Sequence, residues 1–322
     1  MLRPPEFKAR RRILVTGGAG FIGSHLVRRC VREEDEVHVL IRPSSDAARL
    51  ADLRSDITVH RLHFCDRPAV RTCLARARPT HIFHLATDTG GRHEENICGA
   101  ATSAANVTDL LAFLEAIAGA DEPPRVFLRT GTMAEYGAGR TPFREEQREE
   151  PVTCYAAAAT AGTYYAMMAA RHLPFPVITA RLALVYGPGQ AQDFLIPGLI
   201  SACLAGRTFS VMRPGNRRDL LHVTDVVEAL RRLAEIRARG GLIVNVGSGG
   251  AVDMQTLASR VARLAGVGLE TIRMMRQTDC QTLELCTDRM TAMTGWAPRI
   301  CWEEGLAMCV EQARSERLAV VA

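Results

Sequence analysis

The stretch Ile13-Leu14-Val15-Thr16-Gly17-Gly18-Ala19-Gly20-Phe21-Ile22-Gly23 decides the fold of this chain. A short β-branched run meets a cluster of glycines, and residues 24–32 that follow have the pattern of a helix. Gly17, Gly20 and Gly23 let the backbone turn sharply and bring helix N–H groups against a pyrophosphate. Because the cluster lies between a predicted strand and a predicted helix, it indicates a dinucleotide-binding turn. The alternative is a tight turn that binds no ligand.

Composition narrows the class of protein. The 322 residues are 47% hydrophobic, enough for a sizeable core, and the net charge of +5 is too diffuse to indicate nucleic-acid binding. No apolar run approaches the ~20 residues that span a membrane, and residues 1–12 lack the apolar segment of a signal peptide. The ten cysteines include no CxxC pair. These features predict a cytoplasmic protein with free thiols, no metal site and no membrane segment.

Strand-like and helix-like segments alternate through the first half of the chain. The pattern predicts crossover helices at 24–32, 68–77 and 101–118, and strands at 13–16, 36–41, 57–62, 81–85, 126–129, 177–184 and 242–246. This alternation predicts an α/β fold with a doubly wound parallel sheet. Glycines and prolines divide 186–218 into loops and short helices, and 254–322 is mainly helical in pattern. We therefore predict a dinucleotide-binding Rossmann domain of residues 1–180 plus 221–246, and a smaller, mainly helical substrate-binding lobe of 181–220 plus 247–322.

The end of the second predicted strand bears on which dinucleotide is bound. In NAD-binding versions of this fold, an acidic residue there holds the ribose 2′-hydroxyl. Here the strand runs into Arg42-Pro43-Ser44-Ser45, without a carboxylate. Arg42 can form a fork on a 2′-phosphate, and Ser44 can add a hydrogen bond. These residues favour NADP(H) over NAD(H), although an Arg42 that faces solvent beside an NAD adenosine fits the same pattern.

Further motifs follow the glycine turn in a fixed order. They are Asp66 after the third strand, His84-Leu85-Ala86 at the end of the fourth, Thr130-Gly131-Thr132 ahead of Tyr136-Gly137, the segments 151–155 and 181–189, and Arg218-Asp219 ahead of His222-Val223-Thr224-Asp225. In these motifs the chain resembles the extended short-chain dehydrogenases/reductases, in the group called the NAD-dependent epimerase/dehydratase family. The resemblance runs from about Ile13 to Trp296.

The resemblance implies a role for each matching position. The catalytic pair would be Thr132, which orients the substrate oxygen, and Tyr155, the acid/base tyrosine. Arg218 matches the arginine that pairs with the diphosphate of a nucleotide-sugar, and the alternative for it is an ion pair with Asp219 or Asp225. Thr87 and Arg129 complete the expected substrate-binding set. Together with Arg42 and Ser44, the expected cofactor-binding set is Gly17, Gly20, Phe21, Ile22, Gly23, Asp66, Leu85, Ala86 and Tyr155.

One position departs from the family pattern. The family has tyrosine, three residues and then lysine, one helical turn on, where the lysine holds the nicotinamide ribose and lowers the pKa of the tyrosine. This sequence has Tyr155-Ala156-Ala157-Ala158-Ala159, and Lys8 is its only lysine. Three explanations stay open: an engineered inactive variant, a natural branch that lacks the lysine, or a non-catalytic descendant. In a natural branch Arg129 is the nearest candidate cation, with a purely structural arginine as the alternative.

The missing lysine affects the two directions of catalysis unequally. A tyrosine of ordinary pKa, ~10, is protonated at pH 7, so it can donate a proton in ketone reduction but is a poor base for oxidation. This asymmetry favours reduction, and the resemblance implies a nucleotide-sugar substrate, so we expect an NAD(P)(H)-dependent oxidoreductase that reduces a nucleotide-bound 4-keto-sugar, similar to enzymes of deoxysugar pathways. The alternatives are a nucleotide-sugar C4 epimerase that retains NAD and a non-catalytic dinucleotide-binding protein. A homodimer is expected through the helices bearing Asn106 and Tyr155, although their small residues could equally pack within one subunit.

Overall fold

The computed structural model describes residues 10–88, 100–276 and 279–321. The chain packs as two compact units. The first unit comprises Met1–Thr130, Thr153–Thr179 and Arg237–Leu242, and the second comprises Gly131–Val152, Ala180–Ile236 and Ile243–Ala322. The division into a dinucleotide-binding domain and a substrate-binding lobe stays a prediction, because these units are defined by packing alone.

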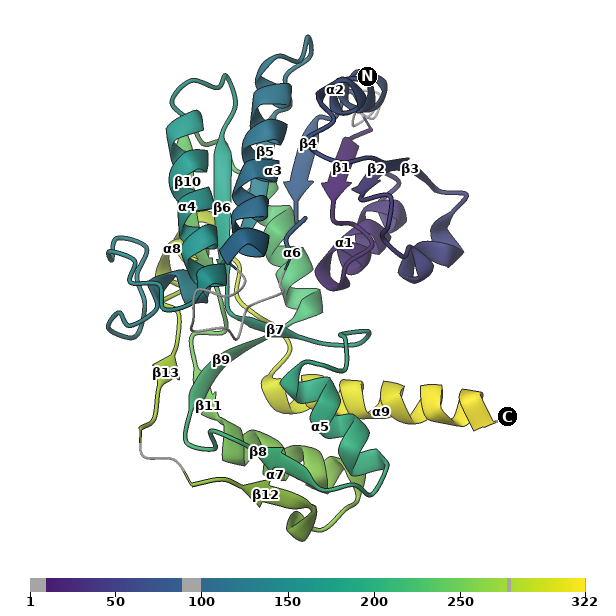
Figure 1. Ribbon diagram of the computed structural model, residues 1–322, viewed down its shortest axis with the longest axis vertical. Coiled ribbons are helices and arrows are strands. Elements are labelled where there is room, and N and C mark those ends of the chain that lie inside the picture. The colour runs from purple at the N-terminus through teal and green to yellow at the C-terminus, as the bar shows by residue number, and fades with distance from the viewer. Residues whose placement is uncertain (1–9, 89–99, 277–278, 322) are drawn as a thin grey trace, which may run out of the picture. The chain divides into compact units, whose positions relative to one another are not determined.

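A seven-stranded sheet runs in the order β10-β6-β5-β4-β1-β2-β3 (Figure 1). Strand β1 pairs in parallel with both β2 and β4, so that Val15 lies opposite Val39 on one side and Phe83 on the other. The chain thus leaves β1 in both directions across the sheet, which confirms the predicted doubly wound α/β fold and creates a switch point at β1. The strands are β1 (Arg12–Thr16), β2 (Glu36–Ile41), β3 (Ile57–Arg61), β4 (His81–His84), β5 (Val126–Thr132), β6 (Val177–Leu182) and β10 (Gly241–Val246).

Two helices of the first unit begin at a side-chain cap. In α2 (Arg67–Ala77), Asp66 accepts a hydrogen bond from the Ala69 N–H, and Thr153 does the same for Ala156 at the start of α4 (Cys154–Ala169). The other helices are α1 (Phe21–Arg32), the 3-10 helix η1 (Ala48–Leu53) and α3 (Ala100–Ala118), which packs against α4. Their core is a cluster that joins strands to helices through Leu14, Leu40, Ile82, Leu110, Phe113, Phe127 and Ala166.

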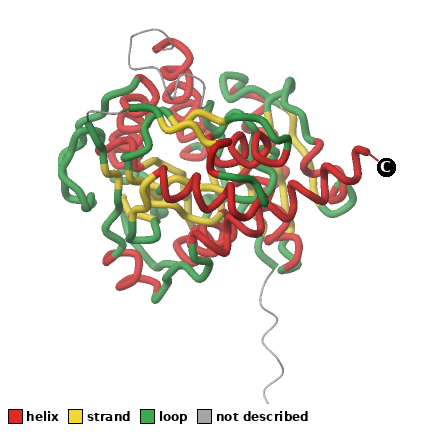
Figure 2. The backbone as a smooth tube through the Cα atoms, turned by 90° about the horizontal axis from the view of Figure 1, so that it is seen from below, coloured by secondary structure: helices red, strands yellow, loops and turns green. Residues whose placement is uncertain are grey.

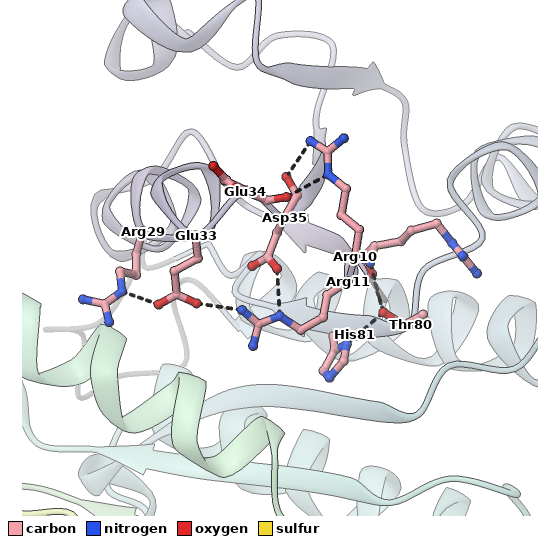
Figure 3. Close-up of polar contacts among 9 residues, drawn as sticks. Arg10, Arg11, Arg29, Glu33, Glu34, Asp35, Thr80 and His81 are labelled. Carbon is pink, nitrogen blue, oxygen red and sulfur yellow. Dashed lines mark hydrogen bonds and ion pairs between the residues drawn. The ribbon is translucent and has the colours of Figure 1, made fainter. Parts of the chain in front are cut away.

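An ion-pair network ties the start of β1 to the turn between α1 and β2 (Figure 3). Arg11 pairs with Glu33 and with Asp35, each with an N–O distance of 2.7 Å, and Arg29 also reaches Glu33. Arg10 adds a hydrogen bond from its Nε to the Glu34 carbonyl oxygen, 2.7 Å away. The Asp35 side chain is only 3% exposed, so this pair is less screened than an ordinary surface ion pair.

The second unit contains smaller sheets and a helical cluster. Strand β9 (Arg217–His222) pairs with β7 (Leu184–Tyr186), β11 (Ala251–Asp253) and β13 (Thr282–Leu283), while β8 (Phe209–Val211) pairs with β12 (Ile272–Met274). Its helices are η2 (Met133–Tyr136), α5 (Leu195–Leu204), α6 (Val223–Ala234), α7 (Met254–Ala265), η3 (Leu269–Thr271), α8 (Asp288–Thr294) and α9 (Trp302–Val321), whose end is marked in Figure 2. Helices α5, α7 and α9 pack around Leu199, Leu257, Val261 and Leu306.

Two predicted strands differ from the structure by more than one residue. The segment 177–184 is not one strand, because it breaks at Ala183 and the following residues pair with β9 in another sheet. The strand expected to end at Arg129 continues to Thr132. Among the described residues, no helix is both long enough and apolar enough to cross a membrane.

Candidate functional site

The glycine turn leaves the start of α1 open to a ligand. Gly17 has a φ of 68°, and its N–H donates to the Leu40 carbonyl 3.0 Å away, which fixes the turn to the end of β2. A Cβ on Gly17 would lie 2.7 Å from the Ala86 nitrogen, and one on Gly23 would overlap the Gly17 carbonyl oxygen. Gly20 is the N-cap of α1 and makes no side-chain cap, so the N–H groups of Phe21, Ile22 and Gly23 lack a side-chain capping acceptor. This cradle fits a pyrophosphate.

Beneath this turn a buried histidine fixes the end of β4. The Thr16 hydroxyl lies 2.9 Å from His84 Nδ1 and accepts a hydrogen bond from the Ala86 N–H at 3.3 Å. The Leu85 N–H donates to the Thr16 carbonyl at 3.1 Å. Burial, helped by the positive charge of Arg129, lowers the pKa of His84 to about 3, so the ring is neutral near pH 7. The two hydrogen bonds to Thr16 hold Leu85 and Ala86 beside the glycine turn.

Arg42 and Ser44, predicted to bind the cofactor ribose, follow β2, and Thr87, predicted to bind substrate, follows β4. Arg42 is exposed and its Nη1 lies 3.4 Å from a carboxylate oxygen of Asp88, while Ser44 and Thr87 are also exposed. Arg61, at the end of β3, donates to the carbonyl oxygens of Pro43 and Ser45 and so shapes the turn that follows Arg42.

Helix α4 displays the tyrosine and the alanine that stands in the lysine position. Tyr155 is half-buried in the first turn, and Ala159 follows one turn later on the same face. A turn beyond, Thr163 accepts a hydrogen bond from Arg129 at 2.8 Å, and Arg129 also reaches Thr179 at 3.4 Å. At 1.5 Å of rise per residue, Thr163 lies about 12 Å along the helix from Tyr155. These are the contacts of a structural arginine, and a substrate role for Arg129 stays a prediction.

Thr132 is fixed by a motif that the sequence reasoning missed. It is the N-cap of η2: its hydroxyl accepts from the Ala134 N–H at 3.2 Å, and its own N–H donates to Glu135 Oε1 at 2.9 Å. Glu135 is fully buried, and its second oxygen lies 2.9 Å from Nε of the fully buried Arg181. The spacing Thr-x-x-Glu is the sequence signal of a capping box and could have revealed Glu135.

Arg218 faces no carboxylate among the described residues. Its guanidinium donates to the carbonyl oxygens of Arg217 and Gln281 and to the Gln281 side chain. Burial, and then the nearby charge of Arg213, lower its pKa to about 10. The alternative of an ion pair is not realised: Asp219 accepts from Ser248, Gly249 and Leu285, and Asp225 accepts from the backbone N–H groups of Arg299 and Ile300.

The predicted site residues are thus divided between the units. The first carries the glycine turn, Arg42, Ser44, Asp66, Leu85, Ala86, Thr87, Arg129 and Tyr155, and the second carries Thr132 and Arg218. Asp66 caps α2 from the end of the loop after β3. In the part of the chain that the structure describes, no group of three or more His, Cys, Asp or Glu side chains is arranged to hold a metal ion.

The sheet order, the switch point at β1 and the open glycine turn define a Rossmann-type α/β protein. The family model described as "NAD dependent epimerase/dehydratase family" matches residues 13–247, and the chain belongs to this family, a group of extended short-chain dehydrogenase/reductase enzymes.

Known relatives extend over nearly the whole chain. A dTDP-glucose 4,6-dehydratase of Streptomyces niveus is 31% identical, over 95% of this chain and 94% of its own. The structure of UDP-glucose 4-epimerase from Thermotoga maritima with UDP-glucose superposes with a TM-score of 0.85 at 25% identity, covering 95% of this chain and 99% of that one. That of dTDP-glucose 4,6-dehydratase from Streptomyces venezuelae with NAD bound also has a TM-score of 0.85, at 25% identity, covering 96% and 98%.

Proposed function

We propose that this protein reduces the 4-keto group of a nucleotide-activated sugar, with NAD(P)H as reductant. The family and the relatives, which are nucleotide-sugar epimerases and dehydratases, support the substrate class. Kinship of fold does not fix the reaction, so the choice of ketone reduction rests on the residues of this chain.

The observation that carries the proposal is the pairing of Tyr155 with Ala159 on one face of α4. A tyrosine with an ordinary pKa of about 10 holds its proton at neutral pH. It can therefore give that proton to a carbonyl oxygen, whereas the reverse reaction needs the tyrosinate as a base. No cation at position 159 assists that ionisation. A reductase tolerates this alanine better than an enzyme that must first oxidise its substrate.

The chain's own residues account for the rest of the step. The open N-terminus of α1 would bind the pyrophosphate, and Leu85 and Ala86 would flank the cofactor, held by Thr16. The dihydronicotinamide, when bound, would supply the hydride for reduction of the carbonyl group. Tyr155 transfers its proton to the carbonyl oxygen, so that a ketone becomes an alcohol, and Thr132 donates a hydrogen bond to the same oxygen. Tyr155 then regains a proton from solvent.

Within this function we infer a preference for NADP(H). Arg42 and Ser44 are exposed at the end of β2, where the ribose of a dinucleotide lies in this fold. Arg61 donates hydrogen bonds to the carbonyl oxygens of Pro43 and Ser45 in the same turn. The Streptomyces venezuelae relative carries NAD, so the preference depends on this arginine-serine turn alone.

The diphosphate of the substrate is assigned to Arg218. Its donors bond to neutral acceptors, and the neighbouring charge of Arg213 repels it. A doubly charged diphosphate would relieve this repulsion and strengthen both arginines' hydrogen bonds.

A nucleotide-sugar C4 epimerase with retained NAD is the second candidate, favoured by the likeness to the Thermotoga maritima epimerase. It predicts that the purified protein contains NAD and converts a 4-epimer without added coenzyme. A reductase would instead require added NADPH and consume it in proportion to the sugar.

We further propose a homodimer that uses the outer faces of α3 and α4. Tyr164, Tyr165 and Met168 are 59%, 43% and 48% exposed on α4, whereas the small residues Ala166 and Ala170 are buried in the subunit's own core. Large apolar side chains at the surface of one helix are typical of an interface.

The decisive experiment compares Ala159→Lys with the parent in NADPH oxidation driven by a nucleotide 4-keto-sugar. The proposal expects measurable turnover by the parent and a gain in the variant. Ala159→Met controls for side-chain length and Ala157→Lys, on the exposed face of the same helix, controls for charge. If every form binds the dinucleotide and none turns over, the protein is a non-catalytic binder toward this substrate class.

A further inference from the structure

Glu135 lies at the centre of a buried network in the second unit. One of its oxygens accepts the Thr132 N–H at 2.9 Å, and the other faces Arg181 Nε, also at 2.9 Å. Glu135 and Arg181 are both fully buried. The carboxylate therefore accepts from two donors, the N–H of the half-buried Thr132 at the end of β5 and Nε of the fully buried Arg181 on β6.

Arg181 is itself held from three sides. Its Nη2 bonds to Glu149, whose side chain is 8% exposed, and its guanidinium carbon lies 4.5 Å from the centre of the Tyr136 ring. Tyr136 stacks on Phe143 and donates to Asn245 at 2.7 Å. The position of the Arg181 guanidinium is thus fixed by packing and by charge, and Glu135 pairs with a cation that cannot move.

The same contacts determine what the Thr132 hydroxyl can do. Its oxygen accepts the Ala134 N–H at 3.2 Å, so one lone pair is already used and the hydroxyl proton remains for an external acceptor. The hydrogen bond from the Thr132 N–H to Glu135 fixes the backbone of Thr132, which carries this hydroxyl. The direction of the hydroxyl is therefore determined by η2, and η2 is anchored through Glu135.

We propose that Glu135 is the positioning residue for Thr132, with Arg181 as its anchor, and that this pair sets the hydrogen bond which Thr132 gives to the substrate carbonyl oxygen. This rests on the proposed function, in which Thr132 contacts the substrate. A misplacement of about 1 Å can cost on the order of 10²-fold in rate, so the anchor matters for turnover although it never touches substrate.

Glu135→Gln is the sharpest perturbation, because it keeps the shape and removes one acceptor. A carboxamide has one oxygen for two donors, and its NH₂ group must face either the Thr132 N–H or Arg181 Nε. Glu149→Gln is the matched control: it makes the same change against the same arginine but does not contact Thr132. A purely structural role predicts equal effects of the two substitutions.

The expected result is that Glu135→Gln lowers kcat about 10- to 100-fold. KM for the sugar should change less than about threefold, because substrate binding is not the interaction removed. Glu149→Gln should keep kcat within about threefold at similar thermal stability. In a Thr132→Ala background, Glu135→Gln should have no further effect on kcat, since it acts through the missing hydroxyl. Equal kcat losses in the two glutamine variants, or an undiminished effect without Thr132, would overturn the proposal.

A second measurement separates this proposal from the proposed function. Amide hydrogen exchange at Thr132, followed by NMR, reports the bond to Glu135 whether or not the protein turns over any substrate. Exchange should accelerate at least tenfold in Glu135→Gln and stay unchanged in Glu149→Gln. Unchanged exchange in both variants overturns the positioning role. If exchange accelerates in Glu135→Gln while the parent protein reduces no 4-keto-sugar, the anchoring role of Glu135 is retained and the proposed function is refuted.

Discussion

Replacing Gly17 by alanine tests the turn on which cofactor binding depends. Gly17 has a φ of 68°, a conformation that strains an alanine by roughly 1–2 kcal/mol. Its Cβ would lie 2.7 Å from the Ala86 nitrogen and 2.8 Å from both the Ala86 Cα and the Leu85 carbonyl carbon. All three are backbone atoms, so the ends of β1 and β4 must separate, at a cost typical of overpacking of about 1–3 kcal/mol. Together these predict a loss of about 2–5 kcal/mol in the free energy of unfolding.

Gly240→Ala is the matched control in the same unit. Its φ is 72° and nothing lies within 4 Å of the position of a Cβ, so it carries the strain without the overlap. It should lose only about 1–2 kcal/mol. Urea unfolding followed by circular dichroism measures both, and calorimetric titration with NADPH measures binding. Gly17→Ala should bind at least tenfold more weakly than Gly240→Ala, because widening the turn moves the α1 N–H groups away from the pyrophosphate.

Two results would refute this reasoning. Equal losses of unfolding free energy in the two variants would mean that Ala86 does not approach Gly17 as closely as described. A folded Gly17→Ala variant with parental NADPH affinity would mean that the glycine turn is not where the dinucleotide binds.

Three further predictions follow from the site. Arg42→Ala should weaken NADPH binding about tenfold, which corresponds to the loss of one charge-assisted hydrogen bond. Fluorescence titration should show unchanged binding of NADH. Equal losses of affinity for both coenzymes would exclude a contact between Arg42 and the 2′-phosphate. Arg218→Gln should raise KM for the nucleotide-sugar about tenfold with little change in the coenzyme KM in steady-state kinetics, and unchanged KM would contradict the diphosphate assignment. The depressed pKa of His84 means that the unfolded chain binds a proton below about pH 6.5 that the folded chain refuses until about pH 3. Stability should therefore fall as pH drops through this window, and His84→Asn should reduce the slope of unfolding free energy by about 1.4 kcal/mol per pH unit in urea titrations at several pH values. An unchanged slope would show that His84 titrates normally.

Local signals predicted the nucleotide-binding half of the sheet well. The strand at 36–41 was predicted with its observed bounds, because β-branched and apolar residues there end at a proline turn. The helix after the glycine turn was predicted from residue 24, but α1 begins three residues earlier, at Phe21, because Gly20 is its N-cap. The doubly wound order follows from the alternation of strands and helices, which leaves few topologies open.

The features that were not predicted from the sequence depend on contacts between residues far apart in the chain. The apolar run through Ala183 looks like one strand, because nothing local reveals that Leu184 pairs with Leu220 in another sheet. A charged residue such as Arg129 argues against a buried strand until Thr163 and Thr179 are placed beside it. The Thr-x-x-Glu spacing signals the capping box of Glu135, but its contact with Arg181, 46 residues further along the chain, has no local signal.

The arginines that precede β1 matter for how the protein is prepared. A recombinant form that begins at Arg12 would lack the guanidinium of Arg11, leaving Asp35 without this cation while its side chain is 3% exposed. Tag removal should accordingly leave Arg10 and Arg11 in place. Shortened preparations should therefore unfold at a lower urea concentration, because this buried carboxylate would have lost its ion pair with Arg11.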